Sequence, residues 1–428
     1  MKKYLGNVAI IITLLITILI WLPLKNLQSF SEIFNQQYLG QITGLLGVIL
    51  IAWDFILAMR LRILEKVFGG LDKLYRIHHL VGGLGFILVL NHPIFLALSR
   101  IALPQSALSL FILGSNWSYN WGILSLYAFI IIIFITLYTK LPYQIWRNIH
   151  ALIGIPLIIA ILHVFFISSD VSRDFTLRIW ILVWLGLALL AFLYKKFLYK
   201  YLAASRRYRL KAINQIGLVA EIILEPLDQK LDFRPGQFIF AEFLTGDLKG
   251  ESHPFSLASD PGRNEIRLGI KALGDFTLKL LNLKPGVAVR LYGPFGSFFD
   301  ASFIKKDYQE VWIAGGIGIT PFLSMLETRA DQASTRVFSL YYGARTVQDA
   351  AFHNYILEYQ KVLPNFKYNF STEIIQIKEI LAQLGENAFR TLFYLCGPPP
   401  MMLAMAATLK QSGIKNPQII FEEFNFKS

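Results

Sequence analysis

Residues 74–98 read LYRIHHLVGGLGFILVLNHPIFLAL, an apolar stretch that carries His78, His79 and His92. A helix of about 20 apolar residues crosses a lipid bilayer, so this stretch is long enough to span a membrane. Ionisable side chains are costly within a membrane and usually mark a functional site there. The stretch therefore predicts a membrane-spanning helix and a functional site inside it.

Five further apolar stretches of similar length lie in the first 200 of the 428 residues. The chain is 55% hydrophobic and only 16% charged, and the apolar excess is confined to this front part. We therefore predict a six-helix transmembrane bundle over residues 1–200. Besides Leu74–Leu98, the predicted spans are Leu5–Leu24, Tyr38–Leu57, Trp121–Leu141, Ile145–Ile167 and Leu177–Leu198.

Lysine and arginine residues gather in every second connection between these spans and again after the sixth span. The positive-inside rule then places both termini and residues 201–428 in the cytoplasm of a multi-pass plasma-membrane protein. The net charge of +13 is explained by these flanking cations, so we do not expect nucleic acid as a partner.

The histidines of the third span fit two sites at different depths. His78 and His92 are 14 residues apart, which returns an ideal helix to within about 40° of one face after ~21 Å. In the fifth span, His150 and His163 are 13 residues apart, which separates them by roughly 140°. We hypothesise that Pro156, between them, changes the winding and brings both to one side.

Imidazole is a common axial ligand of haem iron, so two histidine pairs on two spans predict two haem sites. The alternative is that one or two of these histidines are hydrogen-bonded structural residues. His79 is ambiguous, because it also lies 13 residues before His92, and it better suits a haem propionate or the cytoplasmic interface.

Residues 201–300 change to short β-like runs separated by glycine and proline, which predicts a small antiparallel β-barrel. Three motifs follow one another there: RPGQF at 234–238, HPFSL at 253–257 and GDFT at 274–277. GDFT opens a helical run, and a helix start attracts a pyrophosphate group. Ser256 is placed to hydrogen-bond a flavin ring and His253 to contact its diphosphate.

Residues 301–428 alternate strand and helix, which predicts an α/β doubly wound domain. GGIGITP at 315–321 follows an apolar strand and opens a helix, as a phosphate-binding turn does. Arg345 follows the next strand and favours the 2′-phosphate of NADPH, with a solvated surface arginine as the alternative. CGPPP at 396–400 ends a late strand, and the terminal Phe424 and Phe426 are candidates to stack on the flavin.

HPFSL, GDFT, GGIGITP and CGPPP, in this order, resemble the ferredoxin-reductase flavoprotein module. The histidine pairs, 14 and 13 residues apart, resemble the ferric-reductase-like transmembrane domain. Together they cover nearly the whole chain and resemble the NADPH oxidase and ferric reductase superfamily, most closely its compact bacterial NADPH oxidases.

The resemblance implies two haem b groups, FAD and NADPH as cofactors, with NADH as an alternative because the turn reads Tyr-Gly-Ala-Arg before Thr346. It implies that His78 and His150 hold the cytoplasmic-side haem and that His92 and His163 hold the outer haem. The implied FAD residues are His253, Pro254, Phe255, Ser256, Gly274, Asp275, Phe276 and Thr277.

The resemblance also assigns the nucleotide residues. Arg345 would contact the 2′-phosphate, and Phe424, slightly preferred over Phe426, would cover the isoalloxazine ring until the nicotinamide displaces it. The residues implied for the phosphates are Gly315, Gly316, Gly318, Thr320 and Pro321, and those for the nicotinamide side are Cys396 and Gly397.

The resulting expectation is a transmembrane NADPH oxidase. Electrons would pass from cytoplasmic NADPH through FAD and two bis-histidine haems to oxygen outside, giving superoxide, and no obligatory protein partner is implied. Arg100, at the outer end of the third span, would pair with a propionate or attract an anion, or simply extend to the interface. The rival functions are a ferric-chelate reductase and a haem-bearing electron-transfer subunit for a periplasmic partner.

Overall fold

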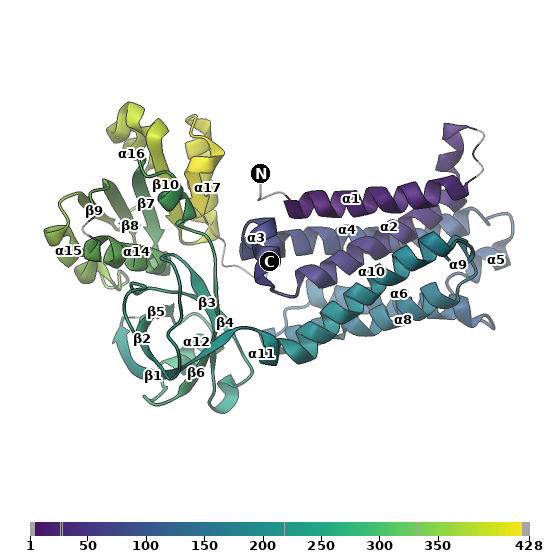
Figure 1. Ribbon diagram of the computed structural model, residues 1–428, viewed down its shortest axis with the longest axis horizontal. Helices are drawn as coiled ribbons and strands as arrows, with labels where there is room; N and C mark the ends of the chain where they lie inside the picture. Colours follow the sequence, from purple (N-terminus) through teal and green to yellow (C-terminus); the bar gives the residue numbers. More distant parts are fainter. Residues whose placement is uncertain (1–4, 26, 28, 218, 333, 422–428) are drawn as a thin grey trace. The chain divides into compact units, whose positions relative to one another are not determined.

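The computed structural model describes residues 5–25, 27, 29–217, 219–332 and 334–421. The chain divides into two compact units, Met1–Ala203 and Ala204–Ser428. The first unit is helical, and the second contains two β-sheets with their covering helices (Figure 1).

In the described part of the first unit, six helical segments are long and apolar enough to cross a membrane, which confirms the six predicted spans. The fifth is broken into two helices, and the sixth continues through a π-helical turn and α11 (Tyr199–Leu202) to Leu202. The spans contain α1 (Leu5–Trp21), α2 (Gln36–Leu57), α4 (Leu71–Leu98), α6 (Trp117–Tyr138), α7 (Tyr143–His150) with α8 (Gly154–Phe166), and α10 (Phe175–Leu193). The short helices α3 (Arg62–Phe68), α5 (Pro104–Leu108) and α9 (Asp170–Arg173) lie in the connections.

Small residues let α2 and α4 approach closely, as is common between membrane helices. A Cβ atom on Gly47 of α2 would lie 2.8 Å from the Val89 side chain of α4, and one on Gly85 would lie 3.1 Å from Leu50. On its other side α2 packs with α10, where Ala52 and Ala188 belong to the buried core of the bundle. The helix carrying His78 and His92 is therefore held firmly against α2.

The first sheet of the second unit is antiparallel throughout and closes into a barrel, as predicted. Its strand order is β4-β3-β6-β1-β2-β5, and a bridge between Leu257 and Leu268 joins the two edges. The strands are β1 (Ser205–Ile216), β2 (Val219–Pro226), β3 (Phe238–Phe243), β4 (His253–Ser256), β5 (Ile266–Lys271) and β6 (Ala288–Phe295), and α12 (Asp275–Leu280) accompanies them.

Two of these strands were not predicted. β1 begins with the basic residues that were attributed to the end of the sixth span, but Tyr208 and Leu210 alternate with them and are buried in the barrel. β4 contains Pro254, a residue type that is rare within strands because it cannot donate a ladder hydrogen bond. Part of the positive charge after the sixth span therefore belongs to the barrel, where Arg207 pairs with Asp228.

The second sheet is parallel, with strand order β11-β10-β7-β8-β9, so the predicted doubly wound domain is confirmed. Helices α14 (Thr320–Asp331) and α15 (His353–Val362) cover one face, and α16 (Ile377–Leu384) and α17 (Pro399–Gln411) cover the other (Figure 1). The strands are β7 (Gln309–Gly315), β8 (Phe338–Gly343), β9 (Phe366–Ser371), β10 (Thr391–Cys396) and β11 (Ile419–Phe421). The direction of winding reverses between β7 and β10, where ligands bind in folds of this kind.

Candidate functional site

The structure brings the membrane histidines together in two groups. The ring centroids of His78 on α4 and His150 on α7 are 6.4 Å apart, with the ring planes at 84°. Fourteen residues further along α4, His92 lies within electrostatic range of His163 on α8. The inner pair and the outer pair thus join the same two spans at two depths.

The fifth span has the irregularity that its histidine spacing requires. Helix α7 ends at His150, a 3-10 turn covers Ala151–Ile153, and α8 starts at Gly154. Pro156 has no N–H group and cannot donate to the Leu152 carbonyl, which accounts for the interruption of regular α-helix at this point.

Three of the four histidines are oriented through Nδ1. The Nδ1 atom of His92 lies 2.6 Å from the Gly40 carbonyl oxygen, and that of His163 lies 2.8 Å from the Ser118 carbonyl oxygen. His78 Nδ1 lies 2.7 Å from Oδ1 of Asp54 and 3.2 Å from its carbonyl oxygen. Because these oxygens only accept, Nδ1 carries the proton, and Nε2 keeps the lone pair that a metal needs.

The residues present fit two haem groups. Metal–imidazole bonds are about 2 Å long, so two imidazoles on opposite sides of one iron have ring centres roughly 6 Å apart. The inner pair has this separation. Beside the outer pair, a Cβ atom on Gly44 would lie 2.6 Å from His92 Nδ1, and one on Gly122 would lie 2.8 Å from the His163 ring. Both positions therefore leave room only for glycine.

His79 and Arg100 lie apart from these pairs. The exposed His79 ring lies 5.6 Å from the His78 ring on the same helix. Arg100 follows α4 and places its guanidinium 5.9 Å from the ring centre of Tyr119. The contact with Tyr119 holds Arg100 beside the start of α6.

In the barrel, the three sequence motifs lie next to one another. Ser256 of HPFSL pairs across the sheet with Phe238 of RPGQF. The His253 ring stacks on Phe276 of GDFT, with centroids 3.8 Å apart, and its Nε2 lies 3.2 Å from a Glu251 carboxylate oxygen. HPFSL and GDFT are thus neighbours in space, although 21 residues separate their first positions.

GDFT begins α12, as predicted. The Thr277 hydroxyl oxygen accepts hydrogen bonds from the backbone N–H groups of Leu273 and Gly274, at 3.0 and 3.1 Å. Thr277 therefore shapes the turn that presents the other motif residues, a role that the sequence motif did not specify.

The two nucleotide motifs meet at the reversal point of the parallel sheet. A Cβ atom on Gly318 would clash with the Cys396 carbonyl group and lie 2.7 Å from the Gly397 nitrogen. A Cβ atom on Gly397 would in turn lie 3.0 Å from Gly315. Gly316 has a φ of +54°, which favours glycine. The absence of side chains lets the carboxyl ends of β7 and β10 come together where a dinucleotide phosphate can approach the backbone.

The remaining predicted nucleotide residues surround this point. The Thr320 hydroxyl donates to the Ile317 carbonyl at 3.1 Å and so holds the turn before Pro321. Arg345 is exposed in the loop after β8, the strand beside β7. Cys396 is buried at the end of β10. Phe424 and Phe426 lie outside the described residues.

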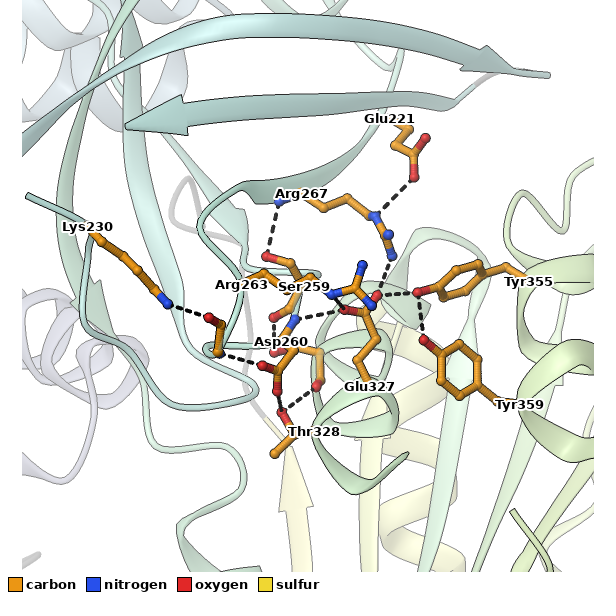
Figure 2. Close-up of polar contacts among 12 residues, drawn as sticks. Glu221, Lys230, Ser259, Asp260, Arg263, Arg267, Glu327, Thr328, Tyr355 and Tyr359 are labelled. Carbon is orange, nitrogen blue, oxygen red and sulfur yellow. Dashed lines mark hydrogen bonds and ion pairs between the residues drawn. The ribbon is translucent and has the colours of Figure 1, made fainter. Parts of the chain in front are cut away.

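A buried polar network joins the barrel to the nucleotide domain (Figure 2). Its centre is Glu327 of α14, whose side chain is fully buried. Glu327 accepts a hydrogen bond from the Asp260 N–H at 2.9 Å and pairs with Arg267 at 2.6 Å and Arg263 at 3.1 Å. It also contacts the Tyr355 hydroxyl, whose pKa is raised by burial and by the Glu327 charge.

Sequence reasoning missed Glu327 and Asp54. In both cases the available signal was a carboxylate at or within a mostly apolar run, PFLSMLE for Glu327 and LIAWDFIL for Asp54. Such a residue is rarely buried without a partner. The identity of that partner could be learned only from the folded chain.

Comparison with protein families gives three matches in the order of the structural parts. Residues 43–162 match the ferric reductase like transmembrane component, residues 210–297 an FAD-binding domain, and residues 312–407 the oxidoreductase NAD-binding domain. The chain belongs to the NADPH oxidase and ferric reductase superfamily. As a member of this superfamily with six apolar spans, it is a multi-pass membrane protein.

This superfamily member also resembles reductase components and electron transfer subunits. It is 30% identical over 213 residues to the reductase component of propane 2-monooxygenase from Rhodococcus jostii, covering 45% of this chain and 56% of that protein. It is 32% identical over 224 residues to the "Probable dihydroorotate dehydrogenase B (NAD(+)), electron transfer subunit" of Thermococcus kodakarensis. This match covers 51% of this chain and 85% of that protein. The chain covers 63% of two mycobacterial propane 2-monooxygenase reductase components, so it spans less than two thirds of several curated relatives.

Among solved structures, flavohemoglobin from Malassezia yamatoensis, with bound FAD and heme, aligns with 96% of this superfamily member and 99% of its own chain. The TM-score is 0.53 and the sequence identity is 20%. At this identity the similarity concerns the fold alone.

Proposed function

We propose that this protein is a transmembrane NADPH oxidase that takes electrons from NADPH in the cytoplasm and delivers them to oxygen on the other side, producing superoxide. The observation that carries the proposal is the presence, in one chain, of a dinucleotide site and two histidine pairs. On α4 the pairs are 14 residues, or ~21 Å, apart. That distance covers most of the ~30 Å hydrocarbon core of a bilayer.

The proposed cofactors are NADPH, FAD and two haem b groups. When bound, FAD supplies the change from two-electron hydride chemistry to single electrons, and the haems supply a path for single electrons across the membrane. The predicted FAD residues lie around the contact between His253 and Phe276. The glycines at the ends of β7 and β10 hold the dinucleotide phosphates against the backbone.

In this proposal Arg345 recognises the 2′-phosphate, and Cys396 and Gly397 lie on the nicotinamide side. Phe424 or Phe426 covers the isoalloxazine ring in the absence of nicotinamide. The exposure of Arg345 beside the nucleotide turn supports its role, because a guanidinium binds phosphate through paired hydrogen bonds.

The four membrane histidines would hold the two groups through Nε2, His78 with His150 and His92 with His163. Each group would then supply one-electron chemistry, which favours superoxide as the product of oxygen reduction. The positive-inside pattern supports a cytoplasmic second unit, with the outer pair facing the opposite side.

A ferric-chelate reductase is the second candidate, and the match to the ferric reductase like transmembrane component favours it. It would use the same residues up to the outer pair and differ only in its acceptor. Several relatives are named as reductase components of larger oxygenase systems, which supports the third candidate, a haem-bearing subunit that serves a separate partner.

The test is to purify the full chain in detergent, add FAD and NADPH, and measure reduction of cytochrome c with and without superoxide dismutase. The oxidase predicts reduction that the dismutase suppresses. Dismutase-insensitive reduction with rapid turnover of ferric chelates would instead establish the reductase. Protein that oxidises NADPH only when a separate acceptor protein is added would support the electron-transfer subunit.

A further inference from the structure

The two histidine pairs differ in the charge beside the Nδ1 atom, although His78 Nδ1 also contacts a backbone carbonyl, that of Asp54 at 3.2 Å. In the outer pair, His92 and His163 both donate to neutral backbone carbonyls, those of Gly40 and Ser118. In the inner pair, His78 Nδ1 lies 2.7 Å from a carboxylate oxygen of Asp54. The inner site therefore has a formal negative charge beside its ligand, whereas the outer site has only backbone dipoles.

Placing the Asp54 carboxylate inside a membrane helix costs free energy. It lies near the end of the second span, and its side chain is only 17% exposed. The six spans together contain just one other carboxylate, Asp72 in the first turn of α4. A buried carboxylate in a membrane helix is retained when it has a functional partner, and the partner here is His78, itself 15% exposed.

The charge of Asp54 reaches the whole inner site. His150, the other member of the inner pair, and the neighbouring His79 also lie within electrostatic range of Asp54. The other carboxylate of the described spans, Asp72, lies in the first turn of α4, 20 residues before His92. Helix α4 leaves space for the carboxylate at Gly82, where a Cβ atom would lie 2.9 Å from Oδ2 of Asp54.

We propose that Asp54 is a positioning residue that lowers the reduction potential of the inner haem below that of the outer haem. This inference rests on the proposed function, in which both pairs hold haem. A carboxylate charge beside the Nδ1–H group polarises the imidazole and makes it a stronger electron donor to the metal. Such a ligand, together with a nearby negative charge, stabilises the oxidised iron more than the reduced iron.

A lower inner potential would give electrons a preferred direction, from the inner site to the outer site. One electron leaves the inner site, which is oxidised, and enters the outer site, which is reduced, with no atom transferred. A lower inner potential makes this step favourable toward the outer face, and the charge of Asp54 supplies the asymmetry between two sites that otherwise have the same ligands.

The test is a potentiometric titration of haem absorbance in the purified full chain, comparing Asp54→Asn with the unaltered protein. Asparagine keeps the shape and the hydrogen-bond acceptor but removes the charge. We expect one of the two haem potentials to rise, with about a tenfold change in the equilibrium constant for reduction, or ~59 mV for one electron. The other potential should stay unchanged.

Asp72→Asn is the matched control, because it removes a carboxylate from the helix of His78, and Asp72 has no histidine contact among the described residues. Asp72→Asn should shift neither haem potential by as much as Asp54→Asn shifts one of them. The inference is overturned if Asp54→Asn retains both haems with unchanged potentials, if both potentials move equally, or if Asp72→Asn gives the same shift.

If Asp54→Asn loses a haem, Gly82→Ala replaces it in the titration, since the added methyl group displaces the carboxylate without removing it. A rise in one potential would then support the inference, and unchanged potentials would overturn it. Unaltered protein without haem absorbance would refute the proposed function itself. That outcome differs from finding two haems whose potentials do not change when Asp54 is replaced.

Discussion

The membrane site and the nucleotide site are built in opposite ways. In the membrane bundle, function is assigned to polar side chains that stand out from an apolar background, such as His78 and His92. At the nucleotide site, function is assigned to glycines, where missing side chains let two strand ends touch. Buried polar side chains in the second unit, such as Glu327, serve to join its two domains. A polar side chain is costly in lipid and usually marks function there, whereas in the second unit the backbone itself can approach a ligand.

The largest expected effect is at the outer histidine pair. His163→Ala removes one of two ligands and should lower haem to about one per chain and abolish electron delivery to the acceptor. Haem absorbance per chain and dismutase-sensitive cytochrome c reduction measure both effects. His79→Ala is the control, because the exposed His79 lies outside the pairs, and it should retain both haems. Full haem content in His163→Ala would contradict the assignment.

The next largest effect is expected at Glu327. Glu327→Gln breaks buried pairs with Arg263 and Arg267, which should destabilise the chain by about 3 kcal/mol or more. Thermal unfolding of the purified protein measures this loss. Glu358→Gln disrupts an exposed pair with Lys361 and should change stability by less than about 1 kcal/mol. Lost NADPH oxidation at unchanged stability would mean that Glu327 has a chemical role. The contrast between functional polar residues in the membrane and structural ones in the second unit would then fail.

A smaller effect is expected at the contact between the two strand ends. Gly318→Ala forces a methyl group against the backbone at Cys396 and Gly397, which should cost about 1–3 kcal/mol and raise the KM for NADPH. Gly274→Ala is the stability control, because its Cβ would meet no atom within 4 Å. An unchanged KM in a destabilised Gly318→Ala protein would separate the close packing from nucleotide binding.

The narrowest effect is expected at Arg345, because it should concern NADPH and not NADH. Arg345→Ala should raise the KM for NADPH by about tenfold or more, because hydrogen bonds to charged groups contribute about 1.5–3 kcal/mol. The KM for NADH should not change, since NADH has no 2′-phosphate. Steady-state kinetics with both dinucleotides provide the measurement. Equal effects on the two would assign Arg345 to general charge attraction.

The strand–helix alternation of the nucleotide domain was predictable. Strands such as β10 and helices such as α16 alternate as expected, since alternation of buried strands and amphipathic helices is a local pattern. β1 and β4 were not predicted, because β1 begins with basic residues like those that flank a membrane span and β4 contains Pro254. There, pairing with neighbouring strands outweighed local preference.

The sequence by itself determined the six spans, because hydrophobic length is required of each span separately. It also determined the positions of the histidines and glycines along their elements. Only the tertiary structure decided which groups meet. The Asp54 carboxylate faces His78 and the Gly40 carbonyl faces His92 because α2 packs against α4. These contacts join residues 24 and 52 positions apart, where no local pattern of sequence records a partner.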